Sequence, residues 1–292
     1  MQLDIFADSR NVMLRRAAAD ALLRQDLAAA ADALISLARE FHGDELLPDL
    51  TILQQACAEH GAAAFRDHDV LAQARCELDG PVSVAAARVY VGTADKLLRP
   101  LWQDLAQRAQ ALPLDRARPE DHAIPLWLRA HAWSQAADAL ALLPSWRRIP
   151  LTLGWMIEAC YRLAALDHLW PLLAELAWLA PARFARTLAA LADPNLERLR
   201  RDFDSTFEAD EQADDGDDHA WWPAWVLIER PALQPWFALA EPAHDQPAER
   251  AMRTVARLLL LERAGRQREI VGCRAELRAL NGCLFARYMR TR

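Results

Sequence analysis

Glycine and the β-branched residues are scarce in this chain. Only 9 of its 292 residues are glycine, and valine, isoleucine and threonine are few beside alanine and leucine. Alanine and leucine favour helices, whereas β-branched residues favour strands. No stretch alternates apolar and polar residues for long enough to form a strand ladder. The sequence therefore predicts an all-α protein.

Long apolar runs and paired cysteines are missing as well. No window approaches the ~18 uncharged apolar residues of a transmembrane helix, and the richest one, residues 169–179, contains Pro171 and Glu175. The N-terminal segment includes Asp4 and Asp8, where an export signal has basic residues before an apolar run. The five cysteines never occur as Cys-x-x-Cys, so we expect reduced and mostly buried thiols. These features predict a cytoplasmic protein without membrane association.

The signatures of common enzyme and metal sites do not occur. The chain contains no His-Glu-x-x-His, Gly-x-Ser-x-Gly, Walker or Gly-x-Gly-x-x-Gly motif. His68-Asp69 suggests the metal ligands of HD phosphohydrolases, but no local signature supplies the further ligands that such a site needs. A capping aspartate beside an exposed histidine explains the Asp-His pairs at residues 67–68, 121–122, 167–168 and 218–219. The sequence therefore predicts no catalytic residue, no metal and no cofactor.

Apolar residues recur at spacings of three and four along most of the chain, which predicts amphipathic helices. Gly80-Pro81 is expected to end one of them, and Pro100 is expected in the first turn of another. Because the connections are short, neighbouring helices must pack antiparallel. The expected helices cover approximately residues 9–24, 26–41, 45–59, 62–77, 82–98, 100–112, 124–130, 133–143, 150–164, 167–179, 181–191 and 194–207.

Short sequence words recur within these helix pairs. The word Ala-Ala-Asp-Ala-Leu occurs at residues 30–34 and again at residues 136–140, about three 35-residue units apart. Residues 128–133 align with residues 161–166, and residues 262–266 form a weaker copy. In each copy a helix ends, small or polar residues turn the chain, and a second helix begins. The pattern indicates repeated helix hairpins.

These hairpins resemble the tetratricopeptide-like superfamily of helical repeats. The best-matching unit covers residues 151–181, with Trp155 and Tyr161 in its first helix and Pro181 at its close. Alanine stands where the turn glycine is usual, and Pro171 lies early in the second helix. The resemblance, which covers roughly half of the chain, implies an α-α superhelix of stacked antiparallel hairpins whose concave face binds protein partners.

We therefore expect a single helical-repeat domain over residues 1–292. The polar residues 115–121 are expected to separate its first helices from the next ones. Its four sub-blocks are the N-terminal helices at 1–113, a tetratricopeptide-like middle at 120–207, an acidic loop at 208–220 and C-terminal helices at 221–292.

The charges of the last third of the chain are segregated. Residues 202–218 contain nine acidic and no basic residues, and they lack EF-hand spacing, so a solvated loop is expected. Residues 250–292 contain eleven arginines and three glutamates, a net charge of +8 by subtraction. This region is a candidate for contacts with nucleic-acid phosphates. The interleaved leucines 258–261 favour instead packing within the molecule, near the acidic loop.

Several of the eleven tryptophans are expected in the core because they stand among apolar neighbours in helices. Two clusters, at residues 146–148 and 221–225, are less easily buried as a whole. They could anchor a partner, because tryptophan and arginine dominate the hot spots of protein interfaces. Burial in the core is the favoured interpretation of both clusters, and contact with a partner is the alternative. The candidate partner-binding residues are Trp146, Arg147, Arg148, Trp221, Trp222 and Trp225.

The combined pattern predicts a non-catalytic cytoplasmic scaffold or adaptor that binds a protein or peptide. The first alternative is a nucleic-acid-binding or regulatory protein that uses Arg253, Arg257, Arg266, Arg268 and their neighbours, although the net charge of −7 argues against a general nucleic-acid binder. The second alternative is an enzyme whose site is assembled between helices from distant residues. The sequence predicts no oligomeric state.

Overall fold

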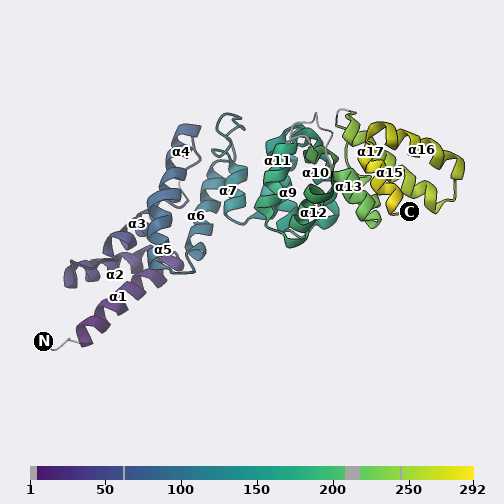
Figure 1. Cartoon of the computed structure of the whole chain (residues 1–292). Coiled ribbons are helices and arrows are strands. Elements are labelled where there is room, and N and C mark those ends of the chain that lie inside the picture. Colours follow the sequence, from purple (N-terminus) through teal and green to yellow (C-terminus); the bar gives the residue numbers. More distant parts are fainter. Residues whose placement is uncertain (1–4, 62, 208–217, 244) are drawn as a thin grey trace. The chain divides into compact units, whose positions relative to one another are not determined.

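A computed structural model describes residues 5–61, 63–207, 218–243 and 245–292 (Figure 1). Every regular element within these ranges is a helix and none is a strand, which confirms the all-α prediction. The chain divides into two compact units, residues 1–136 and 137–292. None of the described helices is long and apolar enough to cross a membrane.

The N-terminal unit is built from helices that pack as sequence neighbours. α1 packs along α2, α3 along α5, and α6 along α7. Leu22, Leu37, Leu50, Leu53 and Leu71 are completely buried between them. The elements are α1 (Ile5–Leu23), α2 (Leu27–Glu40), α3 (Leu47–Ala58), α4 (His68–Glu77), the π-helix η1 (Leu78–Val82), α5 (Ser83–Val89), α6 (Asp95–Arg108), α7 (Ala123–Arg129) and the start of α8 (Trp133–Ala141).

Gly80 and Pro81 do not end a helix. They lie in η1, a wide π turn that connects α4 to α5 without a break. In an α-helix the proline ring would collide with the carbonyl group four residues earlier, and a wider turn relieves this contact. The Ser83 hydroxyl donates a hydrogen bond of 2.6 Å to the Leu78 carbonyl oxygen and supports the turn. The expected boundary at 80–81 is therefore wrong.

The helical path ends only after α5, and the next helix, α6, begins earlier than expected, so that Pro100 has a different position within it. The chain turns after α5 at Gly92, whose φ of 73° is accessible to glycine without strain. α6 then begins at Asp95, so Pro100 lies in its interior and not in its first turn. The buried stripe of α6 starts at Leu97, before the proline, and this burial explains why the helix begins early.

The polar residues 115–121 do not separate two parts of the chain. Arg75 of α4 donates a hydrogen bond of 2.7 Å to Asp121, and Arg118 pairs with Asp69 of α4. These ion pairs fasten the link to the N-terminal unit. The division between the two units falls instead at residue 136, inside α8.

The C-terminal unit surrounds one helix, α10, which packs against α9, α11, α13 and α14. Residues 171–178 of α10 are all buried, so this stretch of the helix has no solvent face. The elements are α9 (Pro150–Arg162), α10 (Leu166–Leu179), α11 (Pro181–Leu191), α12 (Pro194–Thr206), α13 (Trp222–Glu229), α14 (Gln234–Phe237), α15 (Pro247–Arg263), α16 (Gln267–Leu280) and α17 (Gly282–Arg290), with the short 3-10 turns η2 (Trp146–Arg148), η3 (Asp218–Trp221) and η4 (Pro231–Leu233).

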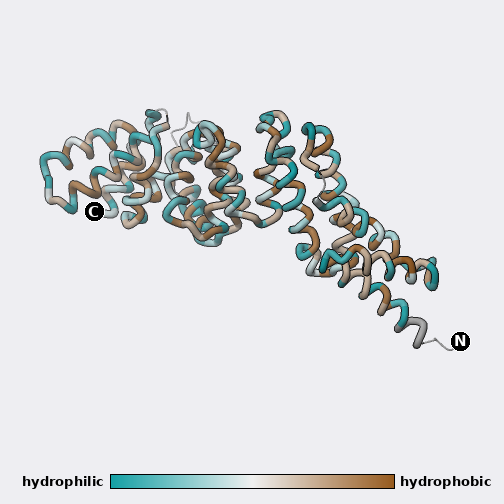
Figure 2. The backbone as a smooth tube through the Cα atoms, turned by 180° about the vertical axis from the view of Figure 1, so that it is seen from behind, coloured by the Kyte–Doolittle hydropathy of each residue, from teal (hydrophilic) through white to brown (hydrophobic). Residues whose placement is uncertain are grey.

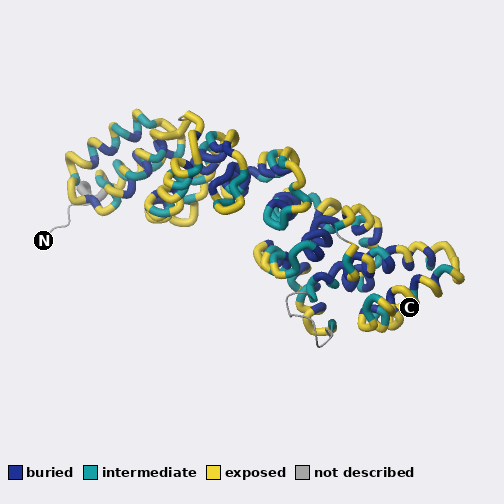
Figure 3. Tube along the Cα trace, turned by 90° about the horizontal axis from the view of Figure 1, so that it is seen from above, coloured by how far each residue is buried: buried dark blue, intermediate teal, exposed yellow. Residues whose placement is uncertain are grey.

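Most of the other helices are amphipathic. Short hydrophobic and hydrophilic stretches alternate along them (Figure 2), and buried residues lie mainly on the facing sides of neighbouring helices (Figure 3). The expected helices at 150–164, 181–191 and 194–207 agree closely with α9, α11 and α12. Of the expected acidic loop, residues 208–217 lie outside the described residues, and residues 218–220 belong to η3.

Four helix hairpins turn through the same hydrogen-bond pattern. A residue with left-handed backbone ends the first helix, and its N–H donates to the carbonyl three positions earlier. The next N–H donates to the carbonyl five positions back, which completes a Schellman motif. The left-handed residues are Gln25, His131, Ala164 and Gly265, with φ of 58°, 57°, 55° and 67°.

Three of these turns lie in the segments of this chain that resemble one another in sequence, namely residues 128–133, 161–166 and 262–266. The recurring word at residues 30–34 and 136–140 lies in the second helix of its hairpin in both copies. The aligned words thus occupy equivalent places in helix hairpins. Membership of the tetratricopeptide-like superfamily and the superhelical arrangement stay predictions.

Replacing Ala164 with glycine is expected to stabilise the protein. Its φ of 55° disfavours residues with a Cβ atom, and its methyl group is exposed, so no packing is lost. Ala164→Gly should raise the free energy of unfolding by about 0.5–1 kcal/mol. Urea denaturation measures the change. The control is Ala165→Gly at a φ of −81°, which should lower the stability slightly; a loss for Ala164→Gly as well would contradict the explanation.

His122 begins α7 in a buried position. Its Nδ1 accepts a hydrogen bond from the Ile124 N–H at 3.3 Å, and only 6% of the residue is exposed. Burial, with a smaller contribution from nearby His68, lowers the pKa of His122 to about 4. At residues 121–122 the expectation of a capping aspartate beside an exposed histidine is therefore wrong: the histidine caps the helix, and Asp121 pairs with Arg75.

The folded protein should lose stability as the pH falls from 6.5 toward 4. In this window the unfolded chain protonates His122 but the folded chain does not, since the pKa is depressed only in the folded state. The loss should reach about 3 kcal/mol at pH 4. His122→Asn keeps a capping acceptor but cannot titrate. Denaturation at several pH values should show a smaller decline for this variant; an equal decline would assign the effect to other groups.

Candidate binding pocket of the N-terminal unit

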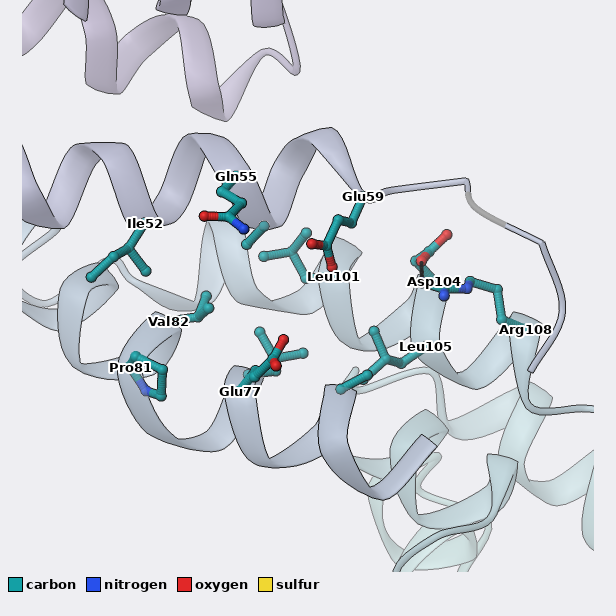
Figure 4. Close-up of a pocket in the computed structure, with 13 residues that line it drawn as sticks. Ile52, Gln55, Glu59, Glu77, Pro81, Val82, Leu101, Asp104, Leu105 and Arg108 are labelled. Carbon is teal, nitrogen blue, oxygen red and sulfur yellow. Dashed lines mark hydrogen bonds and ion pairs between the residues drawn. The ribbon is translucent and has the colours of Figure 1, made fainter. Parts of the chain in front are cut away.

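A pocket of about 240 Å³ opens between α3, the α4–η1 segment and α6 (Figure 4). Its floor consists of buried apolar side chains, and its rim consists mainly of exposed or half-buried polar ones. The floor includes Leu78, Val82, Leu101 and Leu105, and the polar rim includes Gln55, Glu59, Glu77, Asp104 and Arg108.

The periodicity of the helices explains why these residues meet. α6 contributes residues 101, 104, 105 and 108, which follow the i, i+3, i+4, i+7 pattern of one helix face. Gln55 and Glu59 lie one turn apart at the end of α3. The π turn adds Leu78, Pro81 and Val82 to the lining, and such turns are frequent at functional sites.

Asp104 and Arg108 form a structural brace at one end of the pocket. They pair at 3.2 Å, and Asp104 also accepts a hydrogen bond of 2.8 Å from the Gly61 N–H. The Arg108 Nε donates to the Ala63 carbonyl oxygen at 3.1 Å, and its guanidinium lies 4.1 Å from the centre of the Phe65 ring. These contacts hold the chain after α3 against α6, and each charge neutralises the other.

Glu59 and Glu77 contribute negative charges that remain uncompensated. Both side chains are exposed, and they extend toward the pocket from opposite walls in Figure 4. Glu77 accepts a hydrogen bond of 3.1 Å from the Gln73 amide. In the part of the chain that the structure describes, neither carboxylate forms an ion pair. The pocket thus combines an apolar floor with two carboxylates that lack a cationic partner among the described residues.

A second, more open hollow of about 560 Å³ shares Asp104 with the pocket. Trp127 lines it and is only 4% exposed, and its indole N–H has no acceptor among the described residues. Four glutamines also line this hollow, namely Gln25, Gln103, Gln107 and Gln135. A glutamine side-chain amide can both donate and accept hydrogen bonds, so the lining of the hollow is rich in groups that can do both.

The described residues bring no metal site together. No group of three or more His, Cys, Asp or Glu side chains in these ranges could hold a metal ion. In the candidate pair His68-Asp69, His68 Nε2 lies 2.9 Å from the Pro113 carbonyl oxygen and Asp69 pairs with Arg118. His68 thus contacts the chain just before the polar link, and Asp69 fastens the link itself.

Two of the six candidate partner-binding residues lie in the core. Trp222 is fully buried and Trp225 is 2% exposed, which confirms the burial interpretation for both and makes the alternative of a surface anchor wrong. Trp222 packs against Phe184 with ring centres 5.0 Å apart, and Trp225 meets Phe203 edge-on at 5.7 Å. Trp221 is half-buried beside them. Apolar partners from α11 and α12 cover the cluster, and the local sequence of α13 does not reveal them.

Arg147 is also engaged inside the protein. Its Nε donates to buried Glu175 at 2.8 Å, and its Nη1 lies 2.9 Å from Glu241. Burial raises the pKa of Glu175, and the hydrogen bonds from Arg147 oppose this effect. Arg147 therefore joins η2 to α10 and to residue 241 and is not free for a partner. Trp146 is half-buried and Arg148 exposed, and their contact with a partner stays a prediction.

The arginines proposed for nucleic-acid contact fall into two groups. Arg253 pairs with Glu249 at 2.9 Å within α15, and Arg266, the residue before α16, pairs with Glu269 of that helix at 2.5 Å. Arg257 and Arg268 are exposed. The expected packing of this region near the acidic loop concerns residues 208–217, which lie outside the described residues.

The chain matches no protein-family model, no curated protein and no solved structure in comparisons with each of these. The pocket was not among the sequence predictions. Its residues lie on three separated segments between positions 52 and 108. The only local sequence feature that points to the pocket is the spacing of Leu101 and Leu105 in α6, which predicts an apolar helix face.

Removing Arg147 is expected to destabilise the C-terminal unit. Arg147→Met keeps much of the side-chain volume but leaves Glu175 buried without its cation, which should lower the free energy of unfolding by about 3 kcal/mol. Arg148→Met is the matched control, since Arg148 is exposed and should change stability by less than about 0.5 kcal/mol. Chemical denaturation of both variants measures the difference, and equal stabilities would show that the ion pair is dispensable.

Proposed function

We propose that this protein is a non-catalytic scaffold or adaptor whose N-terminal unit binds a segment of a partner protein. The observation that supports this most directly is the pocket between α3, α4–η1 and α6, with buried leucines below a polar rim. Binding pockets commonly combine an apolar lining with a few polar groups that fix orientation. A cytoplasmic location agrees with the five cysteines, which are all free thiols.

The two hollows suit different parts of a bound peptide. The apolar pocket has room for one side chain of the peptide. Burial of the apolar part of that side chain would provide most of the favourable free energy of association. The second hollow offers glutamine amides, which can pair with the N–H and C=O groups of a peptide main chain. Asp104 lines both hollows and thus lies where the two regions join.

Filling the pocket should abolish peptide binding. Ala74 lines the pocket, so Ala74→Trp places an indole in the cavity, whereas Ala58→Trp adds the same group to the exposed side of α3. Peptides enriched from a displayed random heptapeptide library on the intact protein should bind the Ala58→Trp control normally. Their affinity for Ala74→Trp should fall about tenfold or more because the cavity is occupied.

Thermal unfolding of both variants separates blocking from misfolding. If Ala74→Trp unfolds, Gln55→Trp closes the pocket from the exposed rim of α3 and replaces it in the test. The proposal fails if no peptide is enriched, or if the enriched peptides bind the blocked protein as tightly as the unaltered one.

A further inference from the structure

The pocket in the N-terminal unit has an excess of negative charge. Its ionisable lining residues are Glu59, Glu77, Asp104 and Arg108, which sum to three negative charges and one positive charge, a net of −2. The positive charge is already engaged, because Arg108 pairs with Asp104 and donates to the Ala63 carbonyl oxygen. The two remaining carboxylates belong to Glu59 and Glu77, which line opposite walls.

The size of the pocket indicates what part of a ligand enters it. About 240 Å³ is less than the ~300–1,000 Å³ of pockets that enclose drug-sized molecules. One long side chain fits this space better than a cofactor or a folded element. The floor below the rim is apolar, with Leu101 and Leu105 both buried. The occupant must therefore have an apolar stem.

The geometry points to an arginine or lysine side chain of a peptide as the occupant, an inference that rests on the proposed function. Both side chains have an aliphatic stem that packs on apolar surface while the charged head stays at the water boundary. The stem would lie over Leu101 and Leu105, and the head would reach Glu59 and Glu77. The amide oxygen of Gln55 on the same rim is a further acceptor.

Other side chains match the pocket less well. An aspartate, glutamate or phosphorylated residue would be repelled by the two carboxylates. A leucine or methionine would contact the floor but would cover part of the rim and leave Glu59 and Glu77 partly desolvated without a cation. The carboxylates therefore discriminate among side chains by charge, and the leucines discriminate by the presence of a stem.

The experiment measures which residue the pocket selects. The peptides enriched from the heptapeptide library should share one arginine or lysine. Replacing that residue with citrulline or norleucine, which keep the stem and remove the charge, should weaken binding to the intact protein about tenfold. Glu59→Gln and Glu77→Gln should each weaken binding of the basic peptide about threefold, and the double variant about tenfold.

Matched variants separate a local contact from a general charge effect. Glu45 is exposed and does not line the pocket, so Glu45→Gln removes one negative charge elsewhere in the same unit and should leave binding unchanged. In the double glutamine variant, the basic and the citrulline or norleucine peptides should bind equally well. Glu77→Lys brings the net charge of the lining from −2 to zero and should abolish the preference for the basic peptide over its uncharged form.

Failure of this inference is distinguishable from failure of the proposed function. Peptides that lose binding on Ala74→Trp but contain no common basic residue overturn the inference and leave the pocket as a peptide site. Unchanged affinity of the basic peptide for the double glutamine variant overturns it as well. If no enriched peptide is sensitive to Ala74→Trp or Gln55→Trp, the proposed function itself is wrong.

Discussion

The reversal of chain direction at each helix hairpin is the constraint on which both units depend. The individual helices are short and amphipathic, so each must bury its apolar stripe against a neighbour. A left-handed residue provides this reversal at Gln25, His131, Ala164 and Gly265, and its own N–H and the next one each donate a hydrogen bond to a carbonyl of the preceding helix. The motif also satisfies carbonyl groups that a helix end would otherwise leave without donors. Three of these four positions accept left-handed backbone on a residue with a Cβ atom, which shows how strongly the packing of the hairpins enforces the turn.

Charge serves a related purpose where turns and short segments must be held in place. Arginine supplies almost all the basic groups, and its planar fork can contact several acceptors at once. Arg147 joins η2 to α10 and residue 241, Arg75 fastens the polar link to α4, and Arg108 holds the chain that follows α3. Against this background, Glu59 and Glu77 are notable because both line a pocket and neither is paired among the described residues.

The pocket follows from the same packing rules as the fold. The π turn around Pro81 lets one helical path continue from α4 to α5, and its residues line the pocket. The brace formed by Asp104 and Arg108 keeps the end of α3 close to α6. Both features belong to the scaffold, so the proposed ligand would meet a preformed site, which reduces the entropy lost on binding. This arrangement is consistent with a binding protein that presents a rigid surface to its partner.

The sequence by itself determined the helical character, the helices α9 to α12 and the equivalent places of the aligned words, because periodicity and propensity are local properties. It did not determine the π turn at Pro81, because Gly80-Pro81 is equally typical of an ordinary helix end. It also did not determine which side chains bury Trp222 and Trp225, because Phe184 and Phe203 come from other helices. The pocket was equally inaccessible to sequence reasoning. Its lining comes from three segments that only tertiary packing brings together, and a side chain's environment is decided by neighbours that its own sequence does not specify.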